Sequence, residues 1–139
     1  MKNSKFDLED RLIDFGVHMI KLSESIDKRR EASRHLSSQL VRSGTSPGIH
    51  YGEAQAAESR KDFIHKMKLI LKELRETRGN LKMSAKANLC LNPESTSEGI
   101  EECSELIAIF VKSIQTAERN GRKTETEKQN NRSTEKPKK

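Results

Sequence analysis

Two short pairs of residues carry the side chains best suited to chemistry. His50 and Glu53 are three residues apart, and so are Asp62 and His65, so each pair lies on one face of a helix. Dimetal carboxylate bundles bind their metals through Glu-x-x-His pairs on two helices and single carboxylates on two others. Here one pair has Asp in place of Glu, and the other pair is reversed. Because the match is only partial, we expect neither a metal nor another cofactor.

The alternative role for these side chains is a polar network where two helices meet, or a set of ion pairs between subunits. Small residues between Ser43 and Ala57 would let helix backbones approach closely, either within one chain or between copies of it. Buried ion pairs of this kind add specificity more surely than stability. The residues assigned to this network are Arg42, His50, Tyr51, Glu53, Glu58, Arg60, Asp62 and His65.

The sequence lacks the common catalytic patterns. It has no Gly-x-Ser-x-Gly element, and residues 44–48, GTSPG, lack the Gly-Lys-Ser/Thr ending of a phosphate-binding loop. Cys90 and Cys103 do not form a Cys-x-x-Cys pair, and we expect two free thiols in a reducing cytosol. The sequence therefore predicts no catalytic residues and a protein that is not an enzyme.

Basic residues offer the better material for binding. The formal net charge is +6, but residues 1–117 carry only +2 of it and residues 118–139 carry the rest, so overall charge alone is weak evidence for a nucleic-acid partner. Residues at seven-residue intervals make one continuous stripe on a helix. The predicted nucleic-acid contacts are this stripe, Lys61, Lys68, Arg75 and Lys82, with a second cluster at Arg29, Arg30 and Arg34.

Helical periodicity dominates the elements that must position these groups. Apolar residues recur at intervals of four and three within residues 8–26 and again within residues 63–81, which is the pattern of a helix with one buried face. Ile13 and Ile20 widen the first of these faces. A further helix is expected over residues 29–55, and a last one with Ser95 as its N-cap. Four such segments with short connections predict an all-α, antiparallel up-down four-helix bundle.

The last part of the chain has a different composition. After Ala117 no Leu, Ile, Val, Phe or Met occurs, so this part has nothing to bury. We expect a four-helix bundle over residues 1–117 and a disordered, basic, charged tail over residues 118–139. The sequence shows no apolar run of membrane-spanning length and no secretory signal pattern. We expect a soluble cytoplasmic protein with no membrane partner.

Residues 40–77 resemble the family of 23S rRNA-intervening-sequence proteins. Four elements carry the resemblance, in order and without gaps: SGTS-x-G, YGEA-x-AAES, DFIHK and LKE-x-RET. The preceding and following helices fit the family layout, so the resemblance covers about residues 6–117. It implies a helical path straight through the small-residue stretch. Because proline in a helix interior loses a hydrogen bond and costs about 3 kcal/mol, we expect a kink between Ser43 and Pro47.

The resemblance also implies an assembly. Proteins of this family often form ring-like homopentamers, and their biochemical role is not established. A related accessory protein of diversity-generating retroelements is a pentameric bundle that binds nucleic acid and a reverse transcriptase. By analogy, we expect a bacterial homo-oligomer, a pentamer, that binds RNA or DNA electrostatically. A protein-interaction scaffold with no nucleic-acid role is the alternative, and a metal-carboxylate enzyme comes third.

Overall fold

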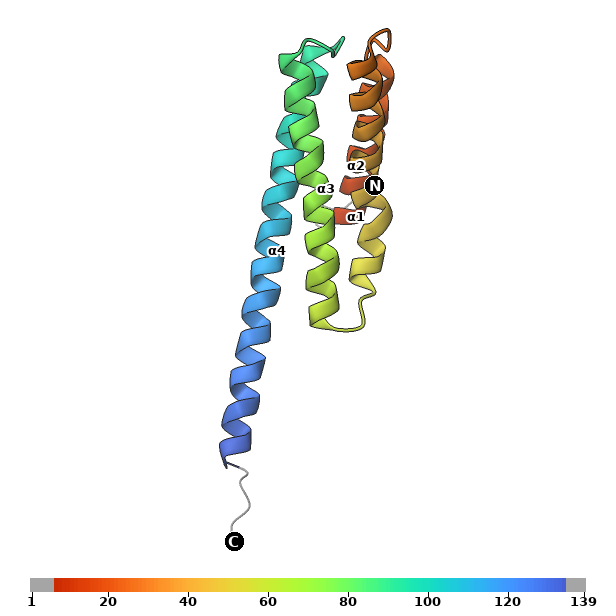
Figure 1. Cartoon of the computed structure of the whole chain (residues 1–139). Coiled ribbons are helices and arrows are strands. Elements are labelled where there is room, and N and C mark those ends of the chain that lie inside the picture. Colours follow the sequence, from red (N-terminus) through yellow and green to blue (C-terminus); the bar gives the residue numbers. More distant parts are fainter. Residues whose placement is uncertain (1–6, 135–139) are drawn as a thin grey trace.

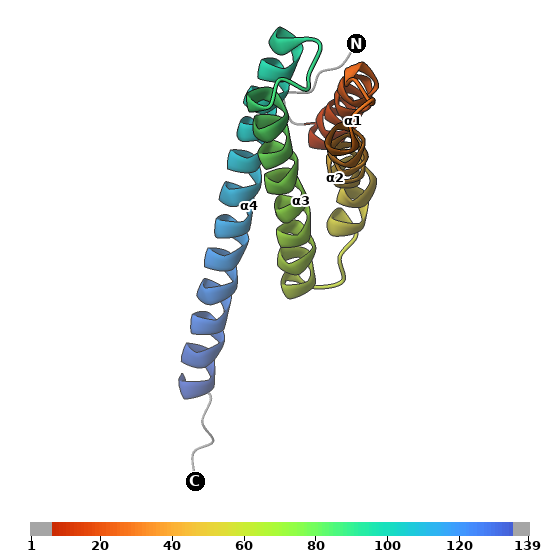
Figure 2. The same ribbon diagram turned by 45° about the horizontal axis from the view of Figure 1, so that its top comes forward.

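The chain folds as an all-α, antiparallel up-and-down four-helix bundle (Figure 1). The computed structural model describes residues 7–134, with the backbone alone for residues 125–128 and 130–134. Its helices are α1 (Leu8–Ser25), α2 (Glu31–Gln55), α3 (Arg60–Lys86) and α4 (Pro93–Thr134). Each helix packs against the next, and α4 makes a smaller contact with α1. The α1–α2 and α3–α4 connections share one end of the bundle, and the α2–α3 connection lies at the other (Figures 1 and 2).

Local signals set most helix ends. Asp7 caps α1, where its side chain accepts a hydrogen bond from the Asp10 amide at 3.0 Å, and Ser59 caps α3 in the same way through the Asp62 amide. The fourth helix begins earlier than the sequence predicts. Asn92 accepts from the Ser95 amide at 3.0 Å, and Pro93 is the first residue of α4. Proline suits that position because its missing N–H is not needed there.

The predicted heptad faces form the core. In α1, the buried residues include Leu12, Phe15, Met19 and Leu22, and in α3 they include Met67, Ile70, Leu74 and Leu81. The α4 residues Cys103, Leu106 and Phe110 complete the same cluster. Burying these side chains supplies most of the stabilisation of such a bundle, at about 25 cal/mol per Å² of apolar surface.

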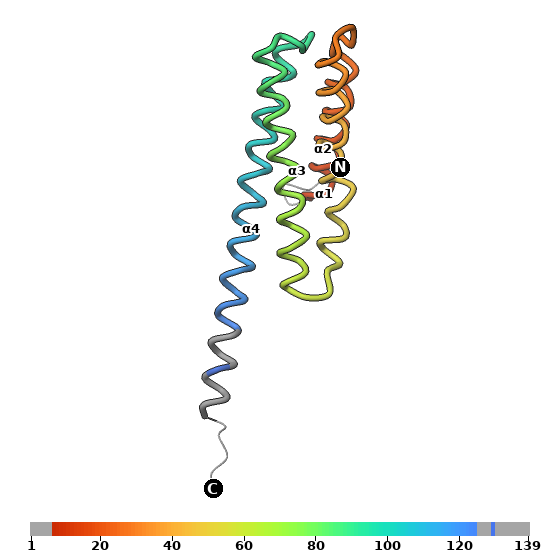
Figure 3. Tube along the Cα trace, viewed as in Figure 1, coloured from red at the N-terminus to blue at the C-terminus, as the bar shows by residue number. Residues whose placement is uncertain are grey.

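The second helix runs without interruption through Pro47, as the expectation for residues 29–55 requires (Figure 3). Its small residues bring α2 close to α1. A Cβ atom at Gly48 would lie 3.2 Å from the Leu12 carbonyl oxygen and 3.3 Å from the Ile13 Cα. A side chain at position 48 would therefore require the α1 backbone to shift by a few tenths of an ångström.

The fourth helix carries bundle contacts beyond Ala117. Lys68 on α3 pairs with Glu118 at 3.3 Å, and Arg60 donates to the Thr124 hydroxyl at 3.3 Å. These contacts attach the first part of the predicted tail to α3. The predicted disorder of residues 118–139 in solution stays a prediction, and residues 135–139 lie outside the described part of the chain.

Candidate functional site

The predicted cationic stripe occupies the outer face of α3 next to α4. Lys61, Lys68, Arg75 and Lys82 are all exposed, and their Cα atoms are spaced about 10.5 Å apart along the helix axis, because a helix rises about 1.5 Å per residue. Of the four, Lys68 is paired with Glu118. The other three make no ion pair within the described residues. Their charges are therefore available to an anionic ligand.

A shallow groove of about 680 Å³ follows this stripe between α3 and α4. Its apolar floor is formed by Leu71 on α3 with Val111 and Ile114 on α4. Its edge on α3 carries Lys68, Lys72 and Arg75, together with Glu76, which is paired with Arg42. The groove is thus an apolar channel with a cationic border, a surface that suits either a phosphate backbone along the border or an acidic helix in the channel.

The second predicted cluster is at the α1–α2 connection, at the same end of the bundle as Lys82. Arg29 is bound to Asp27, with its Nε 2.9 Å from the Asp27 Oδ2. This contact, together with the Arg29 amide, lowers the pKa of Asp27 to about 2. Arg34 donates to the carbonyl oxygens of Lys28 and Arg29. Arg30 is exposed just before α2.

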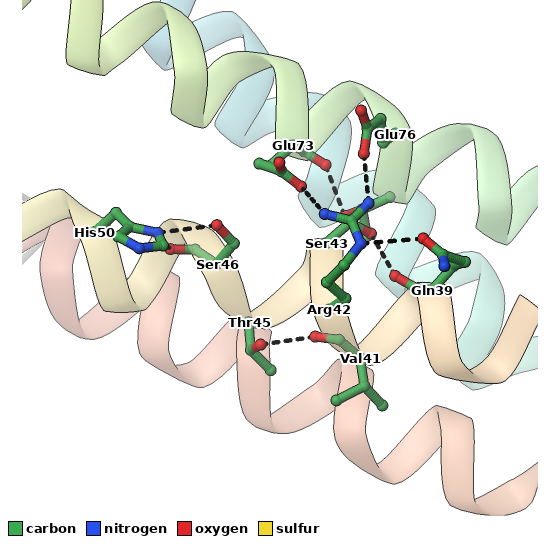
Figure 4. A network of polar contacts seen from close by, with 10 residues as sticks. Gln39, Val41, Arg42, Ser43, Thr45, Ser46, His50, Glu73 and Glu76 are labelled. Carbon is green, nitrogen blue, oxygen red and sulfur yellow. Dashed lines mark hydrogen bonds and ion pairs between the residues drawn. The ribbon is translucent and has the colours of Figure 1, made fainter.

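The predicted polar network between α2 and α3 is centred on Arg42 (Figure 4). Its guanidinium contacts Glu73 at 3.0 Å and Glu76 at 2.7 Å, and its Nε donates to Gln39. On the core side of Arg42, the buried hydroxyl of Thr77 donates to the Ser43 Oγ at 2.9 Å. These contacts fix the axial register of α2 against α3.

His50 and Glu53 line a separate cleft of about 370 Å³ between the same two helices. The His50 Nδ1 lies 3.0 Å from the Ser46 Oγ on its own helix (Figure 4). Across the cleft, α3 contributes Lys66 and the apolar Leu69. The cleft has both signs of charge and an apolar wall.

The remaining residues assigned to the network are dispersed. Tyr51 points to the core, where its ring meets Phe110 edge-on at 6.0 Å between centroids, and burial raises its pKa. Asp62 pairs with Lys66 at 2.9 Å, which lowers the pKa of the carboxyl, and it also accepts from the Glu58 amide. Arg60 reaches α4, and His65 is exposed on α3.

Two observations concern metal-binding and nucleophilic side chains. Within residues 7–134, no three His, Cys, Asp or Glu side chains gather as metal ligands would. Cys103 is buried and its Sγ donates to the Leu74 carbonyl at 3.1 Å. Burial raises the pKa of this thiol to about 12, and a thiol that stays protonated is a poor nucleophile.

Comparison with known families identifies the chain. The family model for the 23S rRNA-intervening sequence protein matches residues 5–112. The chain belongs to this family. The match includes all of α1, α2 and α3 and the part of α4 up to residue 112, so the cationic stripe and the Arg42 network both lie in the family's own domain.

A solved structure agrees with the family assignment. It is a crystal structure from Bacteroides thetaiotaomicron VPI-5482, described as a protein with unknown function from the S23 ribosomal protein family. It is 28% identical, superimposes with a TM-score of 0.69, and covers 77% of this chain and 97% of its own. No curated protein sequence matches the chain. No helix within the described residues is long and apolar enough to cross a membrane.

Family membership does not reveal two features that the structure brings out. Lys72 joins the cationic border and also lines the cleft between α2 and α3. Ile13 and Ile20, which the sequence assigns to a widened core face, are instead exposed at 47% and 39%. In the sequence, the signal for this exposure is the pair Gly44 and Gly48. These glycines let the α2 backbone pack closely against α1, so the α1 side chains beside that contact, Ile13 and Ile20, lie outside the core.

Proposed function

We propose that this chain is a non-enzymatic, self-assembling bundle of the cytoplasm that binds RNA or DNA electrostatically through α3. The observation that carries the proposal is the exposed line of Lys61, Lys68, Arg75 and Lys82 on one helical face. It extends about 31 Å at the helical rise of about 1.5 Å per residue. That length is close to one turn of a B-form duplex, about 34 Å.

The chemistry favours phosphate contacts over base readout. Lysine acts as a point charge towards phosphate, and such contacts position a protein on nucleic acid without reading its sequence. Each phosphate that is neutralised releases counterions, so the affinity must fall with salt. We therefore expect low sequence specificity and a steep salt dependence.

Self-assembly would strengthen a weak site. A homopentamer, which the family resemblance implies, would repeat the cationic stripe around a ring and raise both the local potential and the effective concentration of sites. The bundle is nearly neutral, at +2 for residues 1–117. Copies can therefore approach without strong repulsion while the stripe keeps its local charge.

A fluorescence anisotropy titration of labelled RNA and DNA at two salt concentrations tests the proposal. The variant Arg75→Gln/Lys82→Gln removes two stripe charges, and the matched control Lys21→Gln/Lys112→Gln removes two exposed charges elsewhere. The stripe variant should lower the slope of log K against log salt by about 1.4 to 1.8, since each lost contact changes it by about 0.7 to 0.9. The control should leave the slope unchanged.

Two results would contradict the proposal. An absence of binding at low salt removes the nucleic-acid role, and an equal loss in the control variant removes the stripe as its site. The second candidate function is a scaffold that binds a protein partner and no nucleic acid. The apolar floor of the α3–α4 groove, formed by Leu71, Val111 and Ile114, favours that alternative, because phosphate contacts would leave it uncovered.

A further inference from the structure

A further hollow lies between α3 and α4, at the end of the cationic stripe that is nearest the start of α3. Its volume is about 440 Å³. It is lined from α3 by Arg60, Lys61 and Ile64 and from α4 by Glu118, Gly121, Arg122 and Thr124. We call it the arginine hollow. It brings cations from two helices together, whereas the stripe draws its cations from α3 alone.

The arginine hollow continues the groove that follows the stripe. Lys68 lines the groove, Glu118 lines the hollow, and these two side chains pair at 3.3 Å. Lys61 belongs both to the stripe and to the lining of the hollow. A ligand that follows the stripe towards the start of α3 therefore reaches the hollow.

The α4 side of the hollow lies outside the part of the chain that the family model matches. The match ends at residue 112, and α4 continues past the α2–α3 connection at this end of the bundle (Figure 1). Two contacts attach it to α3 there. Arg60 donates to the Thr124 hydroxyl at 3.3 Å, and a Cβ at Gly121 would lie 3.2 Å from the Arg60 Cδ. The hollow is therefore a feature that family membership does not supply.

The hollow has a surplus of positive charge. The one carboxylate among its lining residues, Glu118, is matched by Lys68. Arg60 and Lys61 are exposed and make no ion pair within the described residues. These two charges alone make the hollow cationic. The exposed Arg122 adds a third cation, which also has a partner of its own, so the surplus does not depend on it.

Phosphate is the anion that this set of donors suits. A guanidinium carries five N–H donors in a planar fork that matches phosphate oxygens, and Arg60 uses one of them for Thr124. Arg60 also lines a neighbouring hollow with Ser113, Thr116 and Asn120. The hydroxyl and amide groups of such residues are common donors to phosphate.

We propose that the arginine hollow is a phosphate-binding subsite, in which Arg60 and Arg122 hold one phosphate group from two helices. The inference rests on the proposed nucleic-acid function and adds a subsite at one end of the stripe. Arginine contacts to phosphate are directional as well as attractive, so the subsite sets where a strand lies along the stripe. A backbone phosphate and a free phosphate ion share this chemistry, and they are distinguished by titration.

Anisotropy titrations of a labelled duplex at low salt test the subsite with one charge variant and one steric variant. Arg60→Gln/Arg122→Gln should weaken binding by about tenfold, which is about the effect of losing one charge-assisted hydrogen bond. Gly121→Leu keeps every charge but places a side chain against Arg60, and it should weaken binding similarly.

Each variant has a matched control. Lys21→Gln/Lys112→Gln removes the same number of charges at exposed positions away from the hollow, and Ala108→Leu adds aliphatic surface at an exposed position of α4. Both controls should bind like the wild type. Circular dichroism checks that the variants stay helical, and Gly121→Leu is suited to this check because leucine is a better helix former than glycine.

NMR titration separates the two sources of phosphate. The probes are inorganic phosphate and the unlabelled duplex, each added at constant ionic strength, and the signals are the Nε–Hε groups of Arg60 and Arg122. Saturable shifts with inorganic phosphate identify a subsite that takes the free ion, and shifts with the duplex alone identify one that takes a backbone phosphate. If neither probe moves these signals, the proposal is overturned.

The outcomes also separate the subsite from the proposed function. If the wild type binds the duplex while Arg60→Gln/Arg122→Gln and Gly121→Leu bind like their controls, the proposed function stands and the subsite is overturned. A wild type that binds no duplex at low salt overturns the proposed function. In that case shifts of the arginine signals with inorganic phosphate leave a free-ion subsite, and their absence overturns both.

Discussion

Gly44 lies directly over Met19, so closely that a Cβ atom at position 44 would be 2.5 Å from the Met19 Cγ and 2.7 Å from its Cβ. These atoms are near the root of the Met19 side chain, which is fully buried, so they cannot move aside as a flexible tip could. The distance between α1 and α2 therefore depends on residue 44 having no Cβ atom.

We predict that Gly44→Ala destabilises the fold. Alanine gains about 1 kcal/mol of helix propensity over glycine, but overpacking a tight core contact costs about 1–3 kcal/mol. The net result should be a loss of up to about 2 kcal/mol in the free energy of unfolding, measured by urea denaturation at fixed protein concentration. Gly79→Ala is the control, since a Cβ there meets nothing within 4 Å, and it should stabilise α3.

Much of this architecture could be predicted from the sequence. The four-three spacing of Leu12, Phe15, Met19 and Leu22 identifies the buried face of α1, because apolar side chains at these intervals share one side of a helix. The path of α2 through Pro47 came from the family resemblance. The sequence alone places the start of α4 one turn too late, since both Asn92 and Ser95 can cap a helix and only the backbone path distinguishes them.

The site was less accessible to sequence reasoning. The stripe from Lys61 to Lys82 follows from periodicity alone, and the structure places all four side chains at the surface. The partners of Arg42 do not follow in this way, because they depend on the axial register of α2 against α3, which sets Glu73 and Glu76 beside it. Likewise, Ile13 and Ile20 carry no local mark of exposure. Their position depends on how closely Gly44 and Gly48 let α2 approach.

We predict that duplex nucleic acid binds more tightly than single strands of the same length. Sequence-tolerant single-strand binding relies on bases stacking on aromatic side chains, at about 1–3 kcal/mol per base. Within the described residues no Phe or Tyr side chain is exposed, and the cations form a straight line. Competition titrations at one salt concentration measure the preference. Equal or tighter binding of the single strand would contradict it.

A third prediction concerns the acidity of Asp27. Its pKa is about 2 because Arg29 donates hydrogen bonds from its side chain and its amide. A carboxyl with a lowered pKa stabilises the fold fully above its ordinary value near 4, and that contribution is lost as the pH falls towards 2. NMR titration of the Asp27 carboxyl should therefore show a midpoint near 2, and Arg29→Gln should raise it.

The same pair bears on ligand binding. Because Arg29 and Asp27 form an ion pair, the double variant Asp27→Asn/Arg29→Gln removes both charges and leaves the net charge unchanged. It should therefore change nucleic-acid affinity less than Arg75→Gln does. A normal Asp27 midpoint in the wild type would contradict the ion pair, and a double variant that binds more weakly than Arg75→Gln would contradict its charge neutralisation.

The last prediction concerns Ser33, which is 1% exposed and whose hydroxyl has no hydrogen-bond partner within the described residues. Leaving a buried polar group unpaired costs about 1–3 kcal/mol, and alanine is the better helix former. Ser33→Ala should therefore stabilise the protein, by about 1 kcal/mol in urea denaturation.

Ser37→Ala is the matched control for Ser33→Ala. It removes the same atom from a buried position of the same helix, but the Ser37 hydroxyl donates to the Ser23 carbonyl at 3.2 Å. The gain in helix propensity is common to both variants, so the difference between them reports the hydrogen bond, with a net worth of about 0.5–1.5 kcal/mol. If both variants shift the unfolding midpoint equally, the Ser33 hydroxyl is satisfied in solution, either by water or by a second copy of the chain.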